Sequence, residues 1–227
     1  TVTEVQTCAL PISQRFGALF EHPNYQLGQA EREIVYLTRG PEDTSVAGGQ
    51  WHADTTMMQA PPMGAILYAL EVPPVGADTL FANQYLAFEA LSPRMQQLLC
   101  GLQAIHDDTR VAGPASGVNA QRTSQVRDDD AWRPTVGVHP VVRTHPESGR
   151  RGLFVNPVYT QRFENMTVEE SEPLLAFLYQ HATRPEFTCR FRWKPGSIAF
   201  WDNRCTLHLA IHDVRARRHM QRTQIAG

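Results

Sequence analysis

The sequence lacks the features that would direct a protein to a membrane or to a nucleic acid. No apolar run approaches the roughly 18 residues of a membrane span, and no secretory signal peptide opens the chain. The 21 lysines and arginines nearly balance the 23 aspartates and glutamates. Because no charge excess favours nucleic acid or an anionic membrane, we expect a small molecule as the partner and leave a homo-oligomer open.

Cysteine is also scarce, and it is badly placed for cross-linking. The sequence contains no CxxC pair, and its four cysteines are widely spread: Cys8, Cys100, Cys189 and Cys205. Such a pattern gives neither a disulfide framework nor a cysteine zinc cluster. We therefore expect reduced thiols and a cytoplasmic protein.

The length of 227 residues predicts one domain with its own core. Residues 1–12, TVTEVQTCALPI, have no helical or strand period and resemble the translation of a sequencing-library adapter. We expect them to be a non-native leader, with an ordinary irregular N-terminus as the alternative. Residues 13–227 then form a single domain. We expect this domain to be clipped at both ends, because the sequence stops at TQIAG in mid-pattern.

Short runs of β-forming residues, separated by Gly, Pro and Asn, predict a mainly β protein with flanking helices. The predicted strands are residues 33–38, 65–72, 78–82, 136–143, 152–155, 188–193 and 197–201. Many short strands favour a closed or sandwiched architecture such as a jelly roll. The polar segment 112–134 has no period, and a loop of that length is typical of a lid or of disorder.

Two segments carry helix signals. Ser92 and Pro93 suit the start of one helix, and Thr167 and Glu170 have the spacing of a capping box at the start of another. The second helix is predicted to pack one face on the core, formed by Leu174, Phe177, Leu178 and His181.

The stretch WHADTTMMQAPPMG, residues 51–64, places a histidine and an aspartate two residues apart. In an extended chain such residues point to one side, so His52 and Asp54 can direct an imidazole and a carboxylate at one point. The pair alone does not separate a metal site from coincidence, because His106 begins a second HxD with nothing that marks it as a site.

The C-terminal stretch SIAFWDNRCTLHLAIHDVRARRHMQRTQIAG adds a third imidazole, His208, just after a strand-like IAFWD. Further along, Arg218 and Arg222 share a face if their segment is a strand. Two histidines and one carboxylate form the facial triad of non-haem Fe(II) oxygenases, which leaves positions open for a 2-oxo acid and O2. The planar fork of arginine suits the remote carboxylate of such an acid.

These elements together resemble the taurine dioxygenase family of Fe(II)/2-oxoglutarate dioxygenases, which includes alkylsulfatases and aryloxyalkanoate dioxygenases. The matching segments are WHAD, PPMGAILYAL, GADTLFAN, HPVVRTHPESGRRGLFVN, WDNR…H and RRHMQR. The resemblance extends from residue 13 to residue 227. It implies a double-stranded β-helix (jelly roll) core and the use of Fe(II), 2-oxoglutarate and O2.

Position by position, the resemblance assigns the iron ligands to His52, Asp54 and His208. It implies that Thr79, within GADTLF, hydrogen-bonds 2-oxoglutarate and that Arg218 pairs with its distal carboxylate. Arg222 is expected at the inner end of the site, near the keto-acid carboxylate and the anionic group of the substrate.

The expected substrate-binding residues match those of the family only in part. His22 and Tyr25 match the His-x-x-Tyr that contacts taurine in the family. A pocket phenylalanine of the family falls on Tyr159, and an asparagine that contacts the taurine amine falls on Gly48. The resemblance therefore implies hydroxylation of a small organosulfonate, releasing sulfite, an aldehyde, succinate and CO2, with weak recognition of an amine.

Three alternatives remain open at this point. The same chemistry could act on an alkyl sulfate or an aryloxyalkanoate. The same three ligands could hold zinc in a hydrolytic β-barrel, although Thr79, Arg218 and Arg222 argue against this because hydrolysis needs no keto-acid clamp. The chain could also be an inert fragment, if residues 1–12 replace native sequence.

Overall fold

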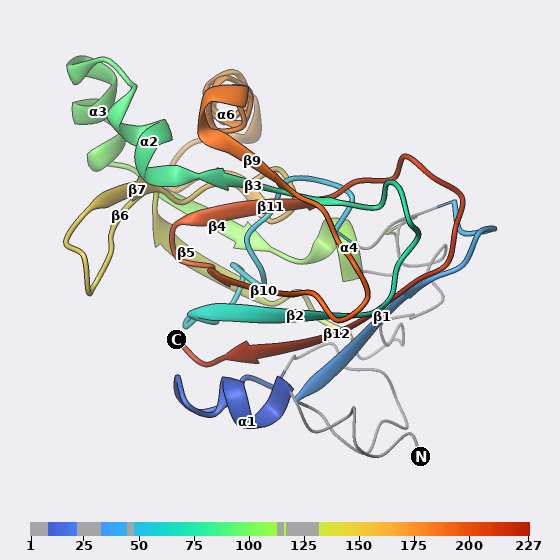
Figure 1. Cartoon of the computed structure of the whole chain (residues 1–227). Helices are drawn as coiled ribbons and strands as arrows, with labels where there is room; N and C mark the ends of the chain where they lie inside the picture. Colours follow the sequence, from blue (N-terminus) through green and yellow to red (C-terminus); the bar gives the residue numbers. More distant parts are fainter. Residues whose placement is uncertain (1–8, 22–32, 45–47, 113–115, 117–131) are drawn as a thin grey trace.

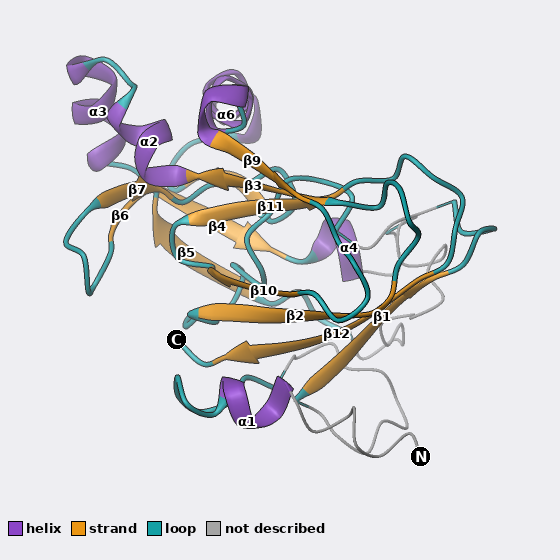
Figure 2. Ribbon diagram, in the orientation of Figure 1, coloured by secondary structure: helices purple, strands orange, loops and turns teal. Residues whose placement is uncertain are grey.

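The computed structural model describes residues 9–21, 33–44, 48–112, 116 and 132–227. Strands dominate, with α2, α3 and α6 on one side of them and α1 on the other, which confirms the prediction of a mainly β protein (Figures 1 and 2). No helix among the residues described is long and apolar enough to cross a membrane.

Two antiparallel sheets face each other and form the centre of the molecule (Figure 1). The four-stranded sheet has the order β1 (Ile34–Arg39), β12 (Arg218–Ile225), β2 (Gly64–Glu71) and β10 (Ile198–Asp202). The three-stranded sheet has the order β11 (Thr206–Ala210), β3 (Thr79–Asn83) and β9 (Thr188–Phe191).

Smaller sheets and helices surround this centre. The sheets are β5 (Val136–Pro140), β4 (Gln103–Asp107) and β8 (Thr160–Phe163), and the pair β6 (Val142–Thr144) and β7 (Arg151–Leu153). The helices are α1 (Ala9–Ser13), α2 (Gln84–Glu89), α3 (Pro93–Cys100), α4 (Thr109–Ala112), α6 (Val168–Ala182) and the 3-10 turn η1 (Pro185–Phe187).

Apolar side chains fill the space between the two facing sheets. Trp201 on β10 and Met220 on β12 are buried, and the Trp201 ring lies 5.4 Å from the Phe81 ring on β3, centroid to centroid. The Trp201 ring also lies 4.8 Å from the imidazole of His208 on β11. The core that joins the sheets therefore also forms a wall behind one predicted metal ligand.

The predicted strands include most of those observed but omit four. One of these, β12, is considered only as a condition for Arg218 and Arg222 to share a face. β4, β8 and β11 are short, and their polar residues interrupt the alternation on which the prediction depends. The missed β11 carries His208, which therefore lies within a strand and not after one. The predicted strand 136–143 is divided into β5 and β6.

The predicted capping box of α6 is confirmed. The Thr167 hydroxyl accepts from the Glu170 amide, and the Glu170 carboxylate accepts from the Thr167 amide. The predicted apolar face was partly wrong, because Phe177 is 44% exposed whereas Leu175 and Leu178 are buried. The buried stripe follows residues 171, 175, 178 and 182, so Phe177 lies one residue off the face that packs on the core.

Several predictions fall on parts of the chain that the structure does not describe. The predicted lid includes residues 113–115 and 117–131, and the predicted leader includes residues 1–8, all of which lie outside the described residues. Residues 9–13 of the chain form α1, which contacts β12 and β2. The leader and the lid stay predictions.

The neighbouring residues Leu178 and Phe177 test which face of α6 belongs to the core. Leu178→Ala is expected to lower the free energy of unfolding by about 2–5 kcal/mol, since it leaves a cavity in a fully buried site. Phe177→Ala, on the half-exposed side, should cost less than about 1 kcal/mol. Urea unfolding of both variants measures the difference, and equal losses would contradict the assigned face.

Candidate metal centre

Backbone pairing brings His52 and His208 together from distant parts of the chain. The His52 amide donates to the His208 carbonyl (3.0 Å), and the His208 amide donates to the His52 carbonyl (2.7 Å). The Ala210 amide donates to the Gly48 carbonyl (2.8 Å), so residues 48–52 run along the open edge of β11. As a result the two imidazole rings lie 4.1 Å apart, centroid to centroid.

The carboxylate of Asp54 completes the group. Its Oδ1 lies 3.7 Å from His52 Nε2 and 3.8 Å from His208 Nε2. One ligand atom from each residue lies within 4.8 Å of the other two. Bonds from a transition metal to nitrogen or oxygen are about 2.1 Å long, so two ligands of one ion lie at most about 4.2 Å apart. The measured separations to Asp54 fit a single ion.

Burial keeps both imidazoles in the form that binds metals. All three side chains are buried, and burial lowers the pKa of His52 although Asp54 opposes the shift. Burial, with the neighbouring His52, lowers the pKa of His208 to about 3. His52 Nδ1 donates to the Gln50 carbonyl (2.7 Å), which leaves the lone pair of Nε2 free for a metal. The site therefore presents neutral nitrogens and one carboxylate, a donor set that suits Fe(II).

Arg222 supplies positive charge beside the carboxylate of Asp54. Its Nη1 donates to Asp54 Oδ1 at 2.9 Å, and its side chain is only 11% exposed. The same strand, β12, carries Arg218 on the same face, because β12 pairs without a break with β1 from Arg39↔Arg218 to Ile34↔Thr223. β12 thus directs two guanidinium groups into the space between the sheets.

Arg218 and Thr79 form a second polar group beside the triad. Trp193 Nε1 donates to Thr79 Oγ1 (3.0 Å), and Arg218 Nη2 lies 3.5 Å from the same oxygen. The Arg218 guanidinium carbon lies 5.8 Å from the centre of the Trp193 ring. Thr79 lies on β3 two residues before Phe81, the residue that pairs with His208.

Arg218 has the character of a buried anion-binding group. It is 8% exposed, and burial, with Arg39, lowers its pKa to about 10 although Asp78 opposes the shift. Within the part of the chain that the structure describes, Arg218 makes no ion pair and its Nε has no hydrogen-bond partner. An anionic ligand would give this cation the partner that the fold does not.

The predicted substrate residues are only partly described. His22 and Tyr25 lie outside the described residues. Tyr159 is buried and packs with Val158 and with Met57, three residues past Asp54. Gly48 has φ +79°, and a Cβ added there would lie 3.1 Å from His52 Cε1. The residue at position 48 is therefore restricted both by its backbone and by a metal ligand.

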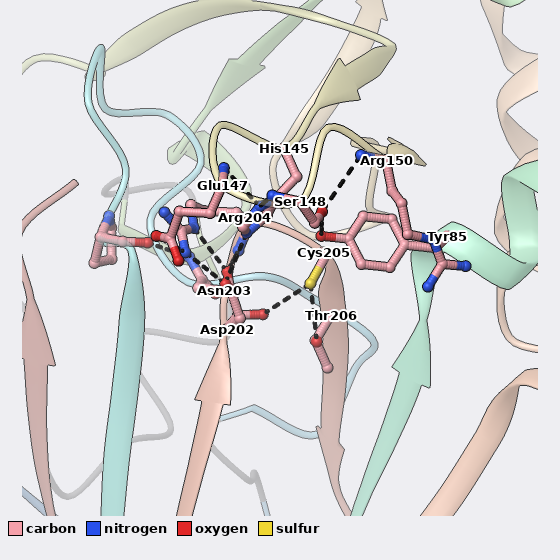
Figure 3. A network of polar contacts seen from close by, with 11 residues as sticks. Tyr85, His145, Glu147, Ser148, Arg150, Asp202, Asn203, Arg204, Cys205 and Thr206 are labelled. Atoms are coloured by element: carbon pink, nitrogen blue, oxygen red, sulfur yellow. Dashed lines mark hydrogen bonds and ion pairs between the residues drawn. The ribbon is translucent and has the colours of Figure 1, made fainter.

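A second group of metal-binding residue types is disfavoured as a metal site by its own hydrogen bonds; it consists of His145, Asp202 and Cys205. His145 Nδ1 accepts from the amides of residues 147 and 148, so the proton is on Nε2, which donates to Asp202 Oδ2 (2.9 Å). A metal on Nε2 would move that proton to Nδ1, against two N–H groups. Burial also raises the pKa of the Cys205 thiol, which disfavours the thiolate ligand. Figure 3 shows this group as a network of hydrogen bonds and ion pairs.

The sequence did not indicate two residues that contact the site. Trp193 fixes the Thr79 hydroxyl, and Asn203 bonds the backbone of Asp54. Asn203 lies within the WDNR segment, but nothing in a single sequence relates it to residues 51–64.

Residues 9–224 match the family described as taurine catabolism dioxygenase TauD, TfdA family. The chain belongs to this family. It is 35% identical to a putative alpha-ketoglutarate-dependent sulfonate dioxygenase from Schizosaccharomyces pombe, over 87% of this chain and 50% of that protein. It is 38% identical to the alpha-ketoglutarate-dependent 2,4-dichlorophenoxyacetate dioxygenase from Cupriavidus pinatubonensis, over 76% of this chain and 58% of that protein. The chain thus spans only 50% and 58% of these two TauD/TfdA relatives.

Among solved structures, the fold is similar to a putative alpha-ketoglutarate-dependent taurine dioxygenase from Burkholderia xenovorans. The TM-score is 0.79 at 33% identity, covering 99% of this chain and 75% of that one. The resemblance to a dioxygenase family drawn from motifs is thereby confirmed at the level of the family.

The three proposed ligands can be tested by metal binding alone. His52→Ala, Asp54→Ala and His208→Ala are each expected to abolish binding of Co(II), which air oxidises less readily than Fe(II), because each leaves a two-ligand site. Isothermal titration calorimetry measures binding, and circular dichroism checks that the fold persists.

His106→Ala is the matched control. His106 belongs to the other HxD and is fully buried, and its Nδ1 bonds Thr56 Oγ1 (2.9 Å) and not the triad. Its variant should lose stability but retain Co(II) binding. Normal Co(II) binding by any of the three triad variants would remove that residue from the ligand set.

Proposed function

We propose that this chain is an Fe(II)- and 2-oxoglutarate-dependent dioxygenase. The observation that carries the proposal is the convergence of one atom each from His52, Asp54 and His208 within 4.8 Å in a buried site. Two imidazoles and one carboxylate leave room at the metal for a bidentate 2-oxo acid and O2. When bound, Fe(II) with 2-oxoglutarate and O2 supplies the oxidation that hydroxylates a C–H bond and yields succinate and CO2.

The proposal extends to the fold and to the domain. We infer that the two facing sheets form a double-stranded β-helix, or jelly roll, and that residues 13–227 form one dioxygenase domain. The alternation of long-range antiparallel pairs, β1 with β12 and β2 with β10, supports this inference. The similarity to a solved taurine dioxygenase of the family supports it as well.

Arg218 and Thr79 would bind the distal carboxylate of 2-oxoglutarate. A guanidinium can donate two parallel hydrogen bonds to a carboxylate, and the buried Arg218 has unused donors. The Trp193 N–H occupies one lone pair of the Thr79 oxygen, so the hydroxyl hydrogen remains available to an acceptor. These residues bind and orient the co-substrate and take no part in proton transfer.

Arg222 would stabilise negative charge at the inner end of the site. It already bonds Asp54 Oδ1, so it is within reach of anions bound beside that carboxylate. Its second role would be to hold the keto-acid carboxylate or the anionic group of the substrate.

A zinc hydrolase is the alternative from another class, and the site supports it less well. A hydrolytic zinc site needs a bound water and a general base, not a second buried cation. The Arg218–Thr79–Trp193 group suits a second anion, which a zinc hydrolase does not require. Release of succinate that depends on 2-oxoglutarate under O2 would separate the two functions.

The role of Arg218 predicts a selective defect. Arg218→Ala is expected to raise the KM for 2-oxoglutarate by about 100–4,000-fold, because leaving a buried carboxylate unpaired costs about 3–5 kcal/mol. The KM for the prime substrate should change far less. Arg217→Ala is the control, since its side chain is 56% exposed and pairs with Glu71 at the surface. An unchanged KM for 2-oxoglutarate in the Arg218 variant would refute its role.

For the substrate we propose a small organosulfonate. The resemblance implies that His22, Tyr25 and Arg222 would bind a tetrahedral anion, which can accept several hydrogen bonds at once. At the other end, Gly48 offers no side chain to an amine, and its positive φ and closeness to His52 explain why glycine suits this position. The relatives named for sulfonate and for 2,4-dichlorophenoxyacetate show that the family divides on substrate.

A substrate panel tests this proposal. Succinate formation and sulfite release should be highest with alkylsulfonates, and taurine should gain nothing from its amino group. The panel includes taurine, alkylsulfonates, alkyl sulfates and aryloxyacetates. Turnover of only an aryloxyacetate or a sulfate ester would refute the sulfonate assignment, but the assignment of iron and 2-oxoglutarate would still hold. Turnover of taurine alone would refute the argument from Gly48.

A further inference from the structure

The metal ligands of the proposed centre are held by different means. His52 and His208 are fixed by their mutual backbone pair, which extends the sheet at β11. Asp54 lies beyond the end of that pairing, in a buried segment without a strand. A buried backbone without a strand partner needs another source of hydrogen bonds.

The side chain of Asn203 provides that source. Its Oδ1 accepts from the Asp54 amide (2.7 Å), and its Nδ2 donates to the Asp54 carbonyl (3.0 Å). The same Nδ2 donates to the Pro62 carbonyl (3.1 Å), and the Asn203 amide donates to the Met63 carbonyl (2.8 Å). One carboxamide thus acts as a neighbouring strand would, pairing both backbone groups of Asp54.

The turn that carries Asn203 is itself fixed on both sides (Figure 3). Asp202 accepts from Arg204 Nε (2.9 Å) and Nη2 (2.6 Å) and from His145 Nε2 (2.9 Å). Arg204 Nη2 also donates to Glu147 (2.9 Å). The loop between β6 and β7 therefore holds the turn between β10 and β11 through His145 and Glu147. Asn203 lies within that turn and is 1% exposed.

We propose that Asn203 is a positioning residue for the metal-binding carboxylate. It would fix the backbone of Asp54 so that the side chain reaches the point at which the two imidazoles meet. This inference rests on the proposed function only in taking the triad as the metal site. Because outer partners of metal ligands orient them, their loss typically costs about 10–100-fold in metal affinity.

The experiment measures Co(II) affinity of the whole chain by calorimetry, together with the visible spectrum of the bound Co(II). Asn203→Ala is expected to weaken binding by about 10–100-fold and to alter the spectrum. Asn203→Asp keeps the acceptor for the Asp54 amide but sets an oxygen against two carbonyls, so it should weaken binding as well. This isosteric variant decides the matter if the alanine variant does not fold.

Gln84→Ala separates positioning from general stability. Gln84 is also 1% exposed, and its amide donates to the carbonyls of Ala82 and Ala182, away from the triad. Its variant should lower the melting temperature as the Asn203 variants do but keep the Co(II) affinity and spectrum. Unchanged Co(II) binding by folded Asn203 variants, or an equal loss in Gln84→Ala, would overturn the inference. Absence of Co(II) binding by the unaltered protein would overturn the proposed function as well.

Discussion

The buried carboxylate of Asp54 is the constraint on which the arrangement of the site depends. A carboxylate at 3% exposure is costly unless positive charge or hydrogen-bond donors surround it. Arg222 supplies the charge, and the imidazoles of His52 and His208 lie within 4 Å of the same oxygen. Because burial keeps both imidazoles neutral, the positive charge of Arg222 balances the negative charge of Asp54 until a metal binds.

These groups come from three separate parts of the chain, so the site exists only when the sheets are assembled. β11 brings His208, β12 brings Arg222, and the segment before β2 brings His52 and Asp54. The core behind the site uses the same strands, since Trp201 contacts both Phe81 and the His208 ring. Packing between the sheets and ligand placement are therefore coupled, and rigid strands keep a metal site precise.

The alternation of side chains along β12 brings two arginines to the same face of the strand. Residues 218 and 222 point to the same side, with the buried Met220 between them in the core. One guanidinium lies at the triad and the other beside Thr79 and Trp193. Two cations on one face would suit a ligand with negative groups at both ends, in keeping with the proposed binding of 2-oxoglutarate.

The sequence by itself determined the class of fold, the capping box at Thr167 and the candidate ligands, because these depend on local pattern and on motifs. It could not decide that Phe177 is half-exposed, since this residue lies only one position off the buried stripe of α6. Nor could it decide that His208 lies within a strand, since short polar-interrupted segments carry weak periodicity. The HxD spacing alone does not separate His52 from His106, and only the resemblance to the family favoured His52. The tertiary structure adds the physical difference, by pairing His52 with His208 and by enclosing His106 among Thr56, His139 and Phe154. Long-range contacts such as that of Asn203 with Asp54 join residues far apart in the chain, and no local pattern records them.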